Sequence, residues 1–174
     1  MSATINGRDG TRGMLLARRF RADYLVPRDH PAPEDVRGRL DDALARGVGR
    51  ALGAALEIRL GSGDDSIWLI RRMEIEVTVN AAWDPAQLAR AWASQLARAV
   101  ARVLEGGDDG ATVLRFPDRA SYLASFLMEL AAGTAWSRWY YPDFEGLRPL
   151  STSAALRTAL ARDPEVGLAA LLLL

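Results

Sequence analysis

The sequence predicts an α+β or α/β fold, in which a small sheet of about three strands carries helices on one face and a helical C-terminal part follows. Residues 20–26 and 67–79 alternate apolar and polar side chains, as strands do, and a short apolar run spans 111–116. Helical periodicity fills the intervals between these segments, and it is the only pattern from residue 117 onward.

The length of 174 residues suits one domain with a sizeable core. Residues 1–13 are polar and contain glycine, which predicts a flexible arm. We expect residues 14–116 to form a β-α-β-α-β region and residues 117–174 to form a helical, aromatic-rich C-terminal region of the same domain.

The first strand is predicted from Phe20, Ala22 and Tyr24, which alternate with charged residues. A loop with three prolines then precedes a helix that begins near Glu34. The apolar residues of this helix recur at spacing four and form one stripe: Val36, Leu40, Leu44, Val48, Leu52 and Leu56. Its second half also contains three glycines: Gly47, Gly49 and Gly53. Each costs about 0.5–1 kcal/mol relative to alanine, which indicates that another element approaches closely there.

The strongest strand pattern covers residues 67–79. This span is long for a globular strand, so we expect a bulge near Arg71 or Arg72. Asp84-Pro85 then predicts an N-cap and a first helical residue. The helix that follows is expected to bury Leu88, Trp92, Leu96, Val100 and Val103 and to end at Gly106-Gly107.

Pro117-Asp118 begins the next predicted helix, which runs to about Ala132 and stops at Gly133. We expect its apolar residues (Leu123, Phe126, Leu127 and Leu130) to pack on a sheet face formed by Ile67, Leu69, Ile75 and Val77. A short aromatic helix at 135–140 and two short helices, at 153–161 and from Asp163-Pro164, complete the pattern. The last four residues are leucines, which leaves two interpretations open: the sequence stops inside a longer architecture, or this helix is buried against a partner.

The composition excludes several classes of function. The formal net charge is zero, so no nucleic-acid partner is expected. Cysteine is absent, which removes disulfides, thiolate metal sites and cysteine nucleophiles, and is compatible with the cytoplasm. Neither a signal peptide nor an apolar run of about 18 residues is present, so no membrane span is predicted.

Motifs for catalysis or cofactor binding are weak. His30, the single histidine, lies in the proline-rich loop, where a solvated turn residue is expected. Glu74 and Glu76 would point the same way on a strand, about 6.5–7 Å apart, a spacing common on solvent-facing strands. The acidic turns at 64–65 and 108–109 are typical of solvated connections, and the glycine-rich turns at 61–63 and 106–110 do not open a helix as a phosphate site requires. We therefore predict a non-enzymatic chain with no catalytic residues, no metal and no cofactor.

Eight of the thirteen aromatic residues fall between Phe116 and Phe144, close to several arginines. We call residues 133–148 the aromatic–arginine segment. Trp, Tyr and Arg are enriched at the energetic centres of interfaces, so the segment predicts a docking surface. The predicted interface residues are Arg138, Trp139, Tyr140, Tyr141, Phe144 and Arg148. Trp136 and Gly146 are expected to act as a structural latch that closes a satellite core, an interpretation compatible with docking.

Four stretches carry a family resemblance: Ile70-Arg71-Arg72-Met73-Glu74-Ile75-Glu76-Val77, Phe116-Pro117-Asp118-Arg119-Ala120-x-Tyr122-Leu123, Gly133-x-Ala135-Trp136-x-Arg138-Trp139-Tyr140-Tyr141 and Phe144-Glu145-Gly146-Leu147-Arg148. In them the chain resembles the N-terminal portion of tape-measure-type proteins of bacterial contractile injection systems, over roughly residues 20–170. Val77-Thr78-Val79 stands where the family has Asp-Leu-Gly, and the family members are usually much longer.

The resemblance implies a structural role in a phage-tail-like particle, either tape-measure-like or tube-capping. Tube, cap or baseplate subunits would be the partners, and assembly would take place in the cytoplasm of the producing cell before the particle is released. Association of the chain with copies of itself is left open. The alternative function is a stand-alone module that binds a small molecule or glycan in an aromatic pocket at Trp136 or Trp139.

Overall fold

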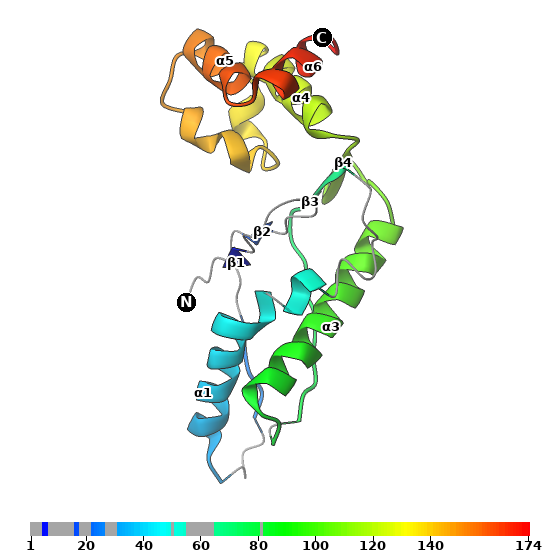
Figure 1. The fold of residues 1–174 in the computed structure, drawn as a ribbon, viewed down its shortest axis with the longest axis vertical. Helices are drawn as coiled ribbons and strands as arrows, with labels where there is room; N and C mark the ends of the chain where they lie inside the picture. The colour runs from blue at the N-terminus through cyan, green and yellow to red at the C-terminus, as the bar shows by residue number, and fades with distance from the viewer. Residues whose placement is uncertain are drawn as a thin grey trace. The chain divides into compact units, whose positions relative to one another are not determined.

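The computed structural model describes residues 5–6, 16–17, 22–26, 31–49, 51–54, 65–80 and 82–174. Over these residues the chain is mostly helical (Figure 1) and divides into two compact units. The first unit comprises residues 1–64 and 74–105, and the second comprises residues 65–73 and 106–174. The second unit is thus built from two separate stretches of chain. The domain boundaries expected from the sequence remain predictions, and the expected arm at 1–13 lies outside the described residues apart from Ile5–Asn6.

Helix α1 (Pro33–Ala43) opens the helical part of the first unit and continues into the π-helical turn η1 (Leu44–Val48). A proline at its start and two acidic residues in its first turn suit the positive end of the helix dipole. The expected apolar stripe is confirmed for Val36, Leu40, Val48 and Leu52, which are buried, while Leu44 is half-buried. Leu56 lies outside the described residues.

Helix α3 (Pro85–Glu105) lies beside α1 (Figure 1). Its N-terminus is a capping box: the Gln87 amide donates to Asp84 Oδ1 at 2.8 Å, and the Asp84 amide donates to Gln87 Oε1 at 3.0 Å. The predicted apolar face is confirmed, with Leu88, Trp92, Leu96 and Val100 buried and Val103 half-buried.

The close approach expected from the glycines occurs at Gly47. A Cβ atom built on Gly47 would lie 2.5 Å from the Cβ of Ala89, so η1 packs directly on α3. The same construction at Gly53 meets no atom within 4 Å. A side chain is therefore excluded at Gly47 but not at Gly53.

The expected strand at 20–26 is wrong over the described residues 22–26, which adopt no strand. Side-chain contacts hold Tyr24 in place: its ring stacks on Trp92, with centroids 6.1 Å apart, and its hydroxyl donates to Asp41 Oδ1 at 2.9 Å. Burial, together with the bond to Asp41, raises the pKa of this hydroxyl. Two short strands nearer the N-terminus, β1 (Ile5–Asn6) and β2 (Leu16–Ala17), pair in antiparallel fashion.

The second unit contains a two-stranded antiparallel sheet of β3 (Ile67–Ile70) and β4 (Val113–Phe116). The strand expected at 111–116 is thus confirmed. The long strand expected over 67–79 is wrong beyond Ile70, because a strand needs a partner and β4 supplies only four residues. The Arg71 amide still donates to the Thr112 carbonyl at 2.8 Å, and residues 72–79 join no strand.

These findings correct the predicted fold class. The expected sheet of three strands is replaced, in the described part of the chain, by pairs of antiparallel strands. The antiparallel pairing of β3 with β4 also removes the α/β alternative, which requires parallel strands. The helical C-terminal part is confirmed.

That part comprises α4 (Arg119–Ala131), the 3-10 helices η2 (Ala135–Ser137) and η3 (Pro142–Leu147), α5 (Thr152–Ala161) and α6 (Pro164–Leu171). Side chains of Asp118, Ser151 and Asp163 accept hydrogen bonds from amides three residues onward and so cap the three α-helices. Gly133 has φ of +75°, a left-handed conformation that ends α4.

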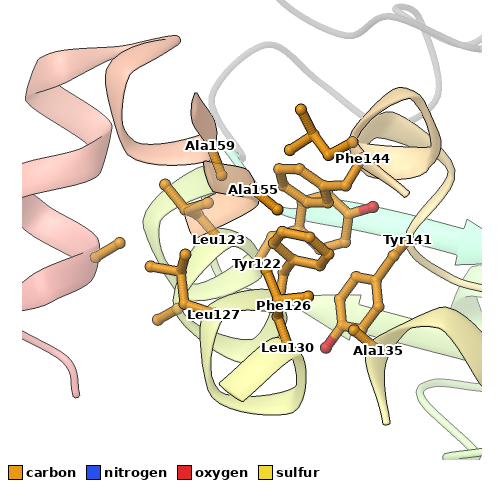
Figure 2. Packing of buried hydrophobic residues seen from close by; sticks show 13 residues of the cluster. Tyr122, Leu123, Phe126, Leu127, Leu130, Ala135, Tyr141, Phe144, Ala155 and Ala159 are labelled. Carbon is orange, nitrogen blue, oxygen red and sulfur yellow. The ribbon is translucent and has the colours of Figure 1, made fainter. Parts of the chain in front are cut away.

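The core of the second unit gathers around α4, whose buried residues include Leu123, Phe126, Leu127 and Leu130 (Figure 2). Ile67 and Leu69 of β3 pack against this cluster, as expected. Ile75 and Val77 were expected on the same sheet face, but they belong to the first unit and lie outside any strand. Half of the predicted sheet face is therefore confirmed.

Candidate docking surface

The aromatic–arginine segment begins where Gly133 stops α4 and returns along that helix through two short 3-10 helices. The Tyr122 hydroxyl, on α4, donates to the carbonyl of Tyr140 at 2.8 Å and joins the returning chain to the helix. Pro142 then begins η3. The segment is therefore joined to α4 at Tyr140.

The inward side of the segment is aromatic. Phe126 of α4 stacks face to face on Phe144, with centroids 3.9 Å apart and planes at 8°. The rings of Trp136 and Tyr141 meet Phe126 edge-on, at 5.6 and 5.2 Å. Figure 2 shows the rings of Phe126, Tyr141 and Phe144 gathered with that of Tyr122. Such stacked and edge-on pairs contribute about 0.5–1.5 kcal/mol each beyond the burial of their area.

Two residues predicted at the interface belong to this core. Tyr141 is only 4% exposed, and Phe144 is also buried. Neither ring lines an accessible surface. Trp136, predicted as a latch, is half-buried and packs on the same cluster. Gly146, the other latch residue, is exposed, and a Cβ atom there would meet nothing within 4 Å.

The outward side brings together Arg138, Trp139 and Tyr140 through Glu129 of α4. Arg138 Nε donates to Glu129 Oε2 at 2.7 Å, and the Tyr140 hydroxyl donates to Glu129 Oε1 at 2.8 Å. The Trp139 ring stands edge-on to Tyr140, with centroids 5.7 Å apart. We call these four residues the Glu129 cluster. The Glu129 carboxylate thus orients two side chains of the predicted interface, Arg138 and Tyr140.

Glu129 raises the pKa of both of its hydrogen-bond donors in the cluster. The hydrogen bond to Glu129, and then its charge, raise the pKa of the Arg138 guanidinium. Burial, followed by the bond to Glu129, raises the pKa of the Tyr140 hydroxyl. Tyr140 therefore stays a neutral hydroxyl that donates to Glu129.

Arg148 occupies a different contact. Its Nη1 lies 3.8 Å from Glu145 Oε1, and both side chains are more than half exposed. An ion pair of this kind contributes about 0–1 kcal/mol to stability. Arg148 is therefore an accessible charge directly after η3 and not a member of the Glu129 cluster.

The Tyr141 hydroxyl is buried and makes no hydrogen bond of ordinary geometry, although the Glu129 carboxylate and the Tyr140 hydroxyl are near enough to interact with it. Burial, and next the charge of Glu129, raise its pKa. A buried hydroxyl without a partner costs about 1–3 kcal/mol of desolvation. Packing of the Tyr141 ring therefore stabilises its buried position, whereas burial of its hydroxyl oxygen destabilises it.

We expect Tyr141→Phe to raise the free energy of unfolding by about 1 kcal/mol, because it keeps the ring and removes the unpaired oxygen. Urea denaturation followed by circular dichroism measures this difference. Tyr122→Phe is the matched control: it deletes the hydroxyl bonded to the Tyr140 carbonyl and should lose about 1 kcal/mol. A loss of stability in both variants would contradict the assignment of Tyr141.

The acidic turn at 108–109 is a self-capped loop. Asp109 Oδ1 accepts from the amides of Ala111, Thr112 and Val113 at 2.7–2.8 Å, and Oδ2 accepts from the Thr112 hydroxyl. These bonds, that of the hydroxyl foremost, hold the pKa of Asp109 well below its usual value of 3.8. The carboxylate organises the turn that leads into β4.

Because the pKa of Asp109 is depressed in the folded state, its contribution to stability is complete above pH 4 and is lost as the pH falls further. We expect Asp109→Ala to lower the free energy of unfolding of the second unit at pH 7. The difference in this free energy between the variant and the wild type should become smaller below about pH 4. Asp109→Asn, which keeps an acceptor oxygen but does not titrate, is the control. Chemical denaturation between pH 2 and pH 7 measures this difference in the free energy of unfolding. A difference that does not change with pH would contradict the role of the Asp109 carboxylate in stabilising the turn.

Other candidates from the sequence do not form a site. Glu74 and Glu76 are exposed on a segment that is not a strand, so the expected strand spacing does not apply to them. His30, Asp64 and the turn at 61–63 lie outside the described residues. The alternative of a ligand pocket at Trp136 or Trp139 stays a prediction.

Over the described ranges, no three His, Cys, Asp or Glu side chains gather as a metal site would require. In the same part of the chain, no helix has the length and apolar character needed to cross a membrane. Sequence reasoning missed one residue of the site, Glu129. In the sequence it is an acidic residue next to Leu130 in a predicted helix, and no motif marks it as a partner of Arg138. Comparisons of the chain with protein-family models, curated proteins and solved structures found no match.

Proposed function

We propose that this chain is a non-enzymatic assembly component of a bacterial contractile injection system, with a tape-measure-like or tube-capping role. It docks on tube, cap or baseplate subunits through the outward side of the aromatic–arginine segment, and it is assembled in the cytoplasm of the producing cell. The family resemblance suggests the particle. The observation that carries the docking role is the Glu129 cluster, which presents Arg138 and Trp139 from a fixed base.

The division of the segment into two sides supports this role. Tyr141 and Phe144 anchor it in the core, while Arg138, Trp139 and Tyr140 remain partly accessible. A segment ordered before binding loses less conformational entropy when a partner arrives. The anchoring residues therefore serve docking indirectly, by holding the exposed ones in place.

The chemistry of the exposed residues suits a protein partner. Trp139 is half-buried and offers a large flat ring, and Trp is among the residues that dominate binding energy at interfaces. Arg138 uses Nε for Glu129, and its side chain is still about half exposed, so the guanidinium is also accessible to a partner carboxylate. Arg148 adds a second accessible guanidinium directly after η3.

We expect Arg148→Ala to weaken binding to the partner subunit by more than about 1 kcal/mol and to leave the melting temperature nearly unchanged. Titration calorimetry with purified tube, cap and baseplate subunits measures the affinity, and thermal melts of the same preparations measure stability. Arg157→Ala on α5 is the matched control, because Arg157 is also exposed but lies outside the segment. It should bind as the wild type does.

Trp139→Ala tests the cluster itself and should lose affinity together with Arg148→Ala. If stability falls in step with binding in both variants, the segment acts as a core latch and the docking role is lost. Particles that assemble completely and function without this chain would remove the proposal as a whole.

A further inference from the structure

The two edges of the β3–β4 sheet differ in how their backbone groups are satisfied. The Arg71 amide donates to the Thr112 carbonyl at 2.8 Å, so these two opposed residues form a hydrogen-bonded pair just beyond the end of β3. In antiparallel strands, hydrogen-bonded pairs alternate with pairs that exchange no hydrogen bond. The amides and carbonyls of Trp68 and Ile70 therefore point away from β4, toward the outer edge of β3.

The outer edge of β4 is closed by the acidic turn that precedes it. The Val113 amide donates to Asp109 Oδ1 at 2.8 Å, and the Val113 carbonyl accepts from the Asp109 amide at 3.1 Å. The Arg115 amide donates to Asp108 Oδ2 at 2.9 Å. These bonds occupy the backbone groups with which a further strand would pair, so this edge accepts no strand.

The outer edge of β3 is open. Among the described residues, none forms a hydrogen bond with the outward amides and carbonyls of Trp68 and Ile70. The four residues of β3 are uncharged and half-buried. An uncharged edge with unpaired backbone groups is a template on which an extended strand adds through backbone hydrogen bonds. The sheet is therefore protected on one side and accessible to a strand on the other.

The residues that flank β3 carry opposite charges at its two ends. The sequence reads Asp64-Asp65-Ser66 before the strand and Arg71-Arg72 after it. Asp65 and Arg71 are both exposed, and within the described ranges neither forms an ion pair. A strand with acids at its start and bases at its end is complementary in charge to an antiparallel copy of itself.

We propose that the outer edge of β3 is a self-association surface, on which β3 of a second copy pairs in antiparallel fashion about a two-fold axis at Trp68. In this register Asp65 lies opposite Arg71 of the second copy, and symmetry repeats the pair on the other side of the axis. A shift by two residues would instead place Arg71 opposite Ile67, or Asp65 opposite Leu69. The charges therefore select one register, and a second copy supplies both of them by symmetry.

The same register suits the centre of the strand and its backbone. Ile67 lies opposite Leu69 of the second copy, and Trp68 lies opposite its own equivalent, so apolar side chains face apolar side chains. Trp68 and Ile70, whose backbone groups point outward, fall on the hydrogen-bonded positions of the new ladder. The two sheets thus join into one sheet of four strands, whose outer edges are the closed edges of β4.

Strands of this length make a small contact, which places the dimer among weak, reversible assemblies. We expect a dissociation constant in the micromolar range. The Glu129 cluster takes no part in the pairing, so the inference does not rest on the proposed function.

Sedimentation velocity of the full chain between about 1 and 500 µM tests the inference, since it needs no other subunit. Low ionic strength is used because salt screens exposed ion pairs. We expect the average mass to rise with concentration from the 19.0 kDa monomer toward twice that value. Asp65→Arg and Arg71→Asp each convert both opposite-charge pairs into like-charge pairs, so each should weaken the dimer at least about tenfold. Arg157→Asp is the matched control, because Arg157 is exposed on α5, outside this edge, and the variant should associate as the wild type does.

An equimolar mixture of the two single variants tests the register itself. One variant then presents only bases at positions 65 and 71 and the other only acids, so a mixed dimer regains both opposite-charge pairs and should form as the wild-type dimer does. A wild-type chain that is monomeric at every concentration overturns the inference. So does a dimer that neither single variant weakens, and so does a mixture that associates no better than its components.

Discussion

Replacing Phe126 with alanine is expected to lower the free energy of unfolding of the second unit by about 3–5 kcal/mol. Phe126 has no exposed surface, and its ring contacts Phe144, Trp136 and Tyr141. The substitution removes the ring around which the aromatic–arginine segment is organised. It leaves a cavity. The surrounding rings, Phe144, Trp136 and Tyr141, belong to different short turns of the chain and do not move into it.

Urea denaturation followed by circular dichroism and tryptophan fluorescence measures this loss. Met128→Ala is the matched control on the same helix, because Met128 is exposed and its truncation should cost less than about 1 kcal/mol. If Phe126→Ala also costs less than about 1 kcal/mol, α4 does not bury this face in solution. The aromatic–arginine segment would then not be held in place by packing on α4.

Gly167→Ala is expected to cost the second unit about 2 kcal/mol. The added Cβ would approach the Leu160 carbonyl oxygen to 2.6 Å and the Leu160 Cα to 3.4 Å, and these are backbone atoms that do not rotate away. Overpacking typically costs about 1–3 kcal/mol or more, whereas the better helix propensity of alanine returns at most about 1 kcal/mol.

The thermal midpoint of Gly167→Ala, compared with that of Gly146→Ala, gives the measurement. Gly146 is the matched control, since a Cβ there has no neighbour within 4 Å, and its substitution should change stability by less than about 0.5 kcal/mol. This control also tests the predicted latch role of Gly146. A Gly167→Ala variant as stable as the wild type would show that α6 moves freely on α5.

Helix positions were predictable from the sequence because their signals are local. A capping side chain bonds an amide three residues away, so Asp84, Asp118 and Asp163 mark helix starts without knowledge of the fold. The left-handed stop at Gly133 is equally local.

Strand length was not predictable in the same way. Residues 67–79 carry strand periodicity throughout, yet β3 ends at Ile70 because β4, far along the sequence, has only four residues to pair with it. The alternation of apolar and polar residues indicates which residues suit a strand. The length of the partner strand decides how many of them form one.

The docking surface was predictable in composition but not in orientation. Tyr140 and Tyr141 are neighbours, and both were predicted at the interface because tyrosine is enriched there. Their rings are in edge-on contact, with centroids 4.7 Å apart, but Tyr141 is buried in the core while Tyr140 is half-buried at its border and bonds Glu129. Glu129 lies nine residues before Arg138, and its contact depends on how the chain reverses after α4.

The discontinuous second unit has a consequence for synthesis on the ribosome. Strand β3 emerges long before β4, because α3 and its flanking residues are translated between them. At about 5–20 residues per second, β3 waits several seconds for its partner. During this interval Ile67 and Leu69 lack both the β4 ladder and the α4 core that cover them in the finished protein. The nascent chain therefore exposes an unpaired apolar strand, the kind of segment that chaperones bind, until the last third of the protein has left the ribosome.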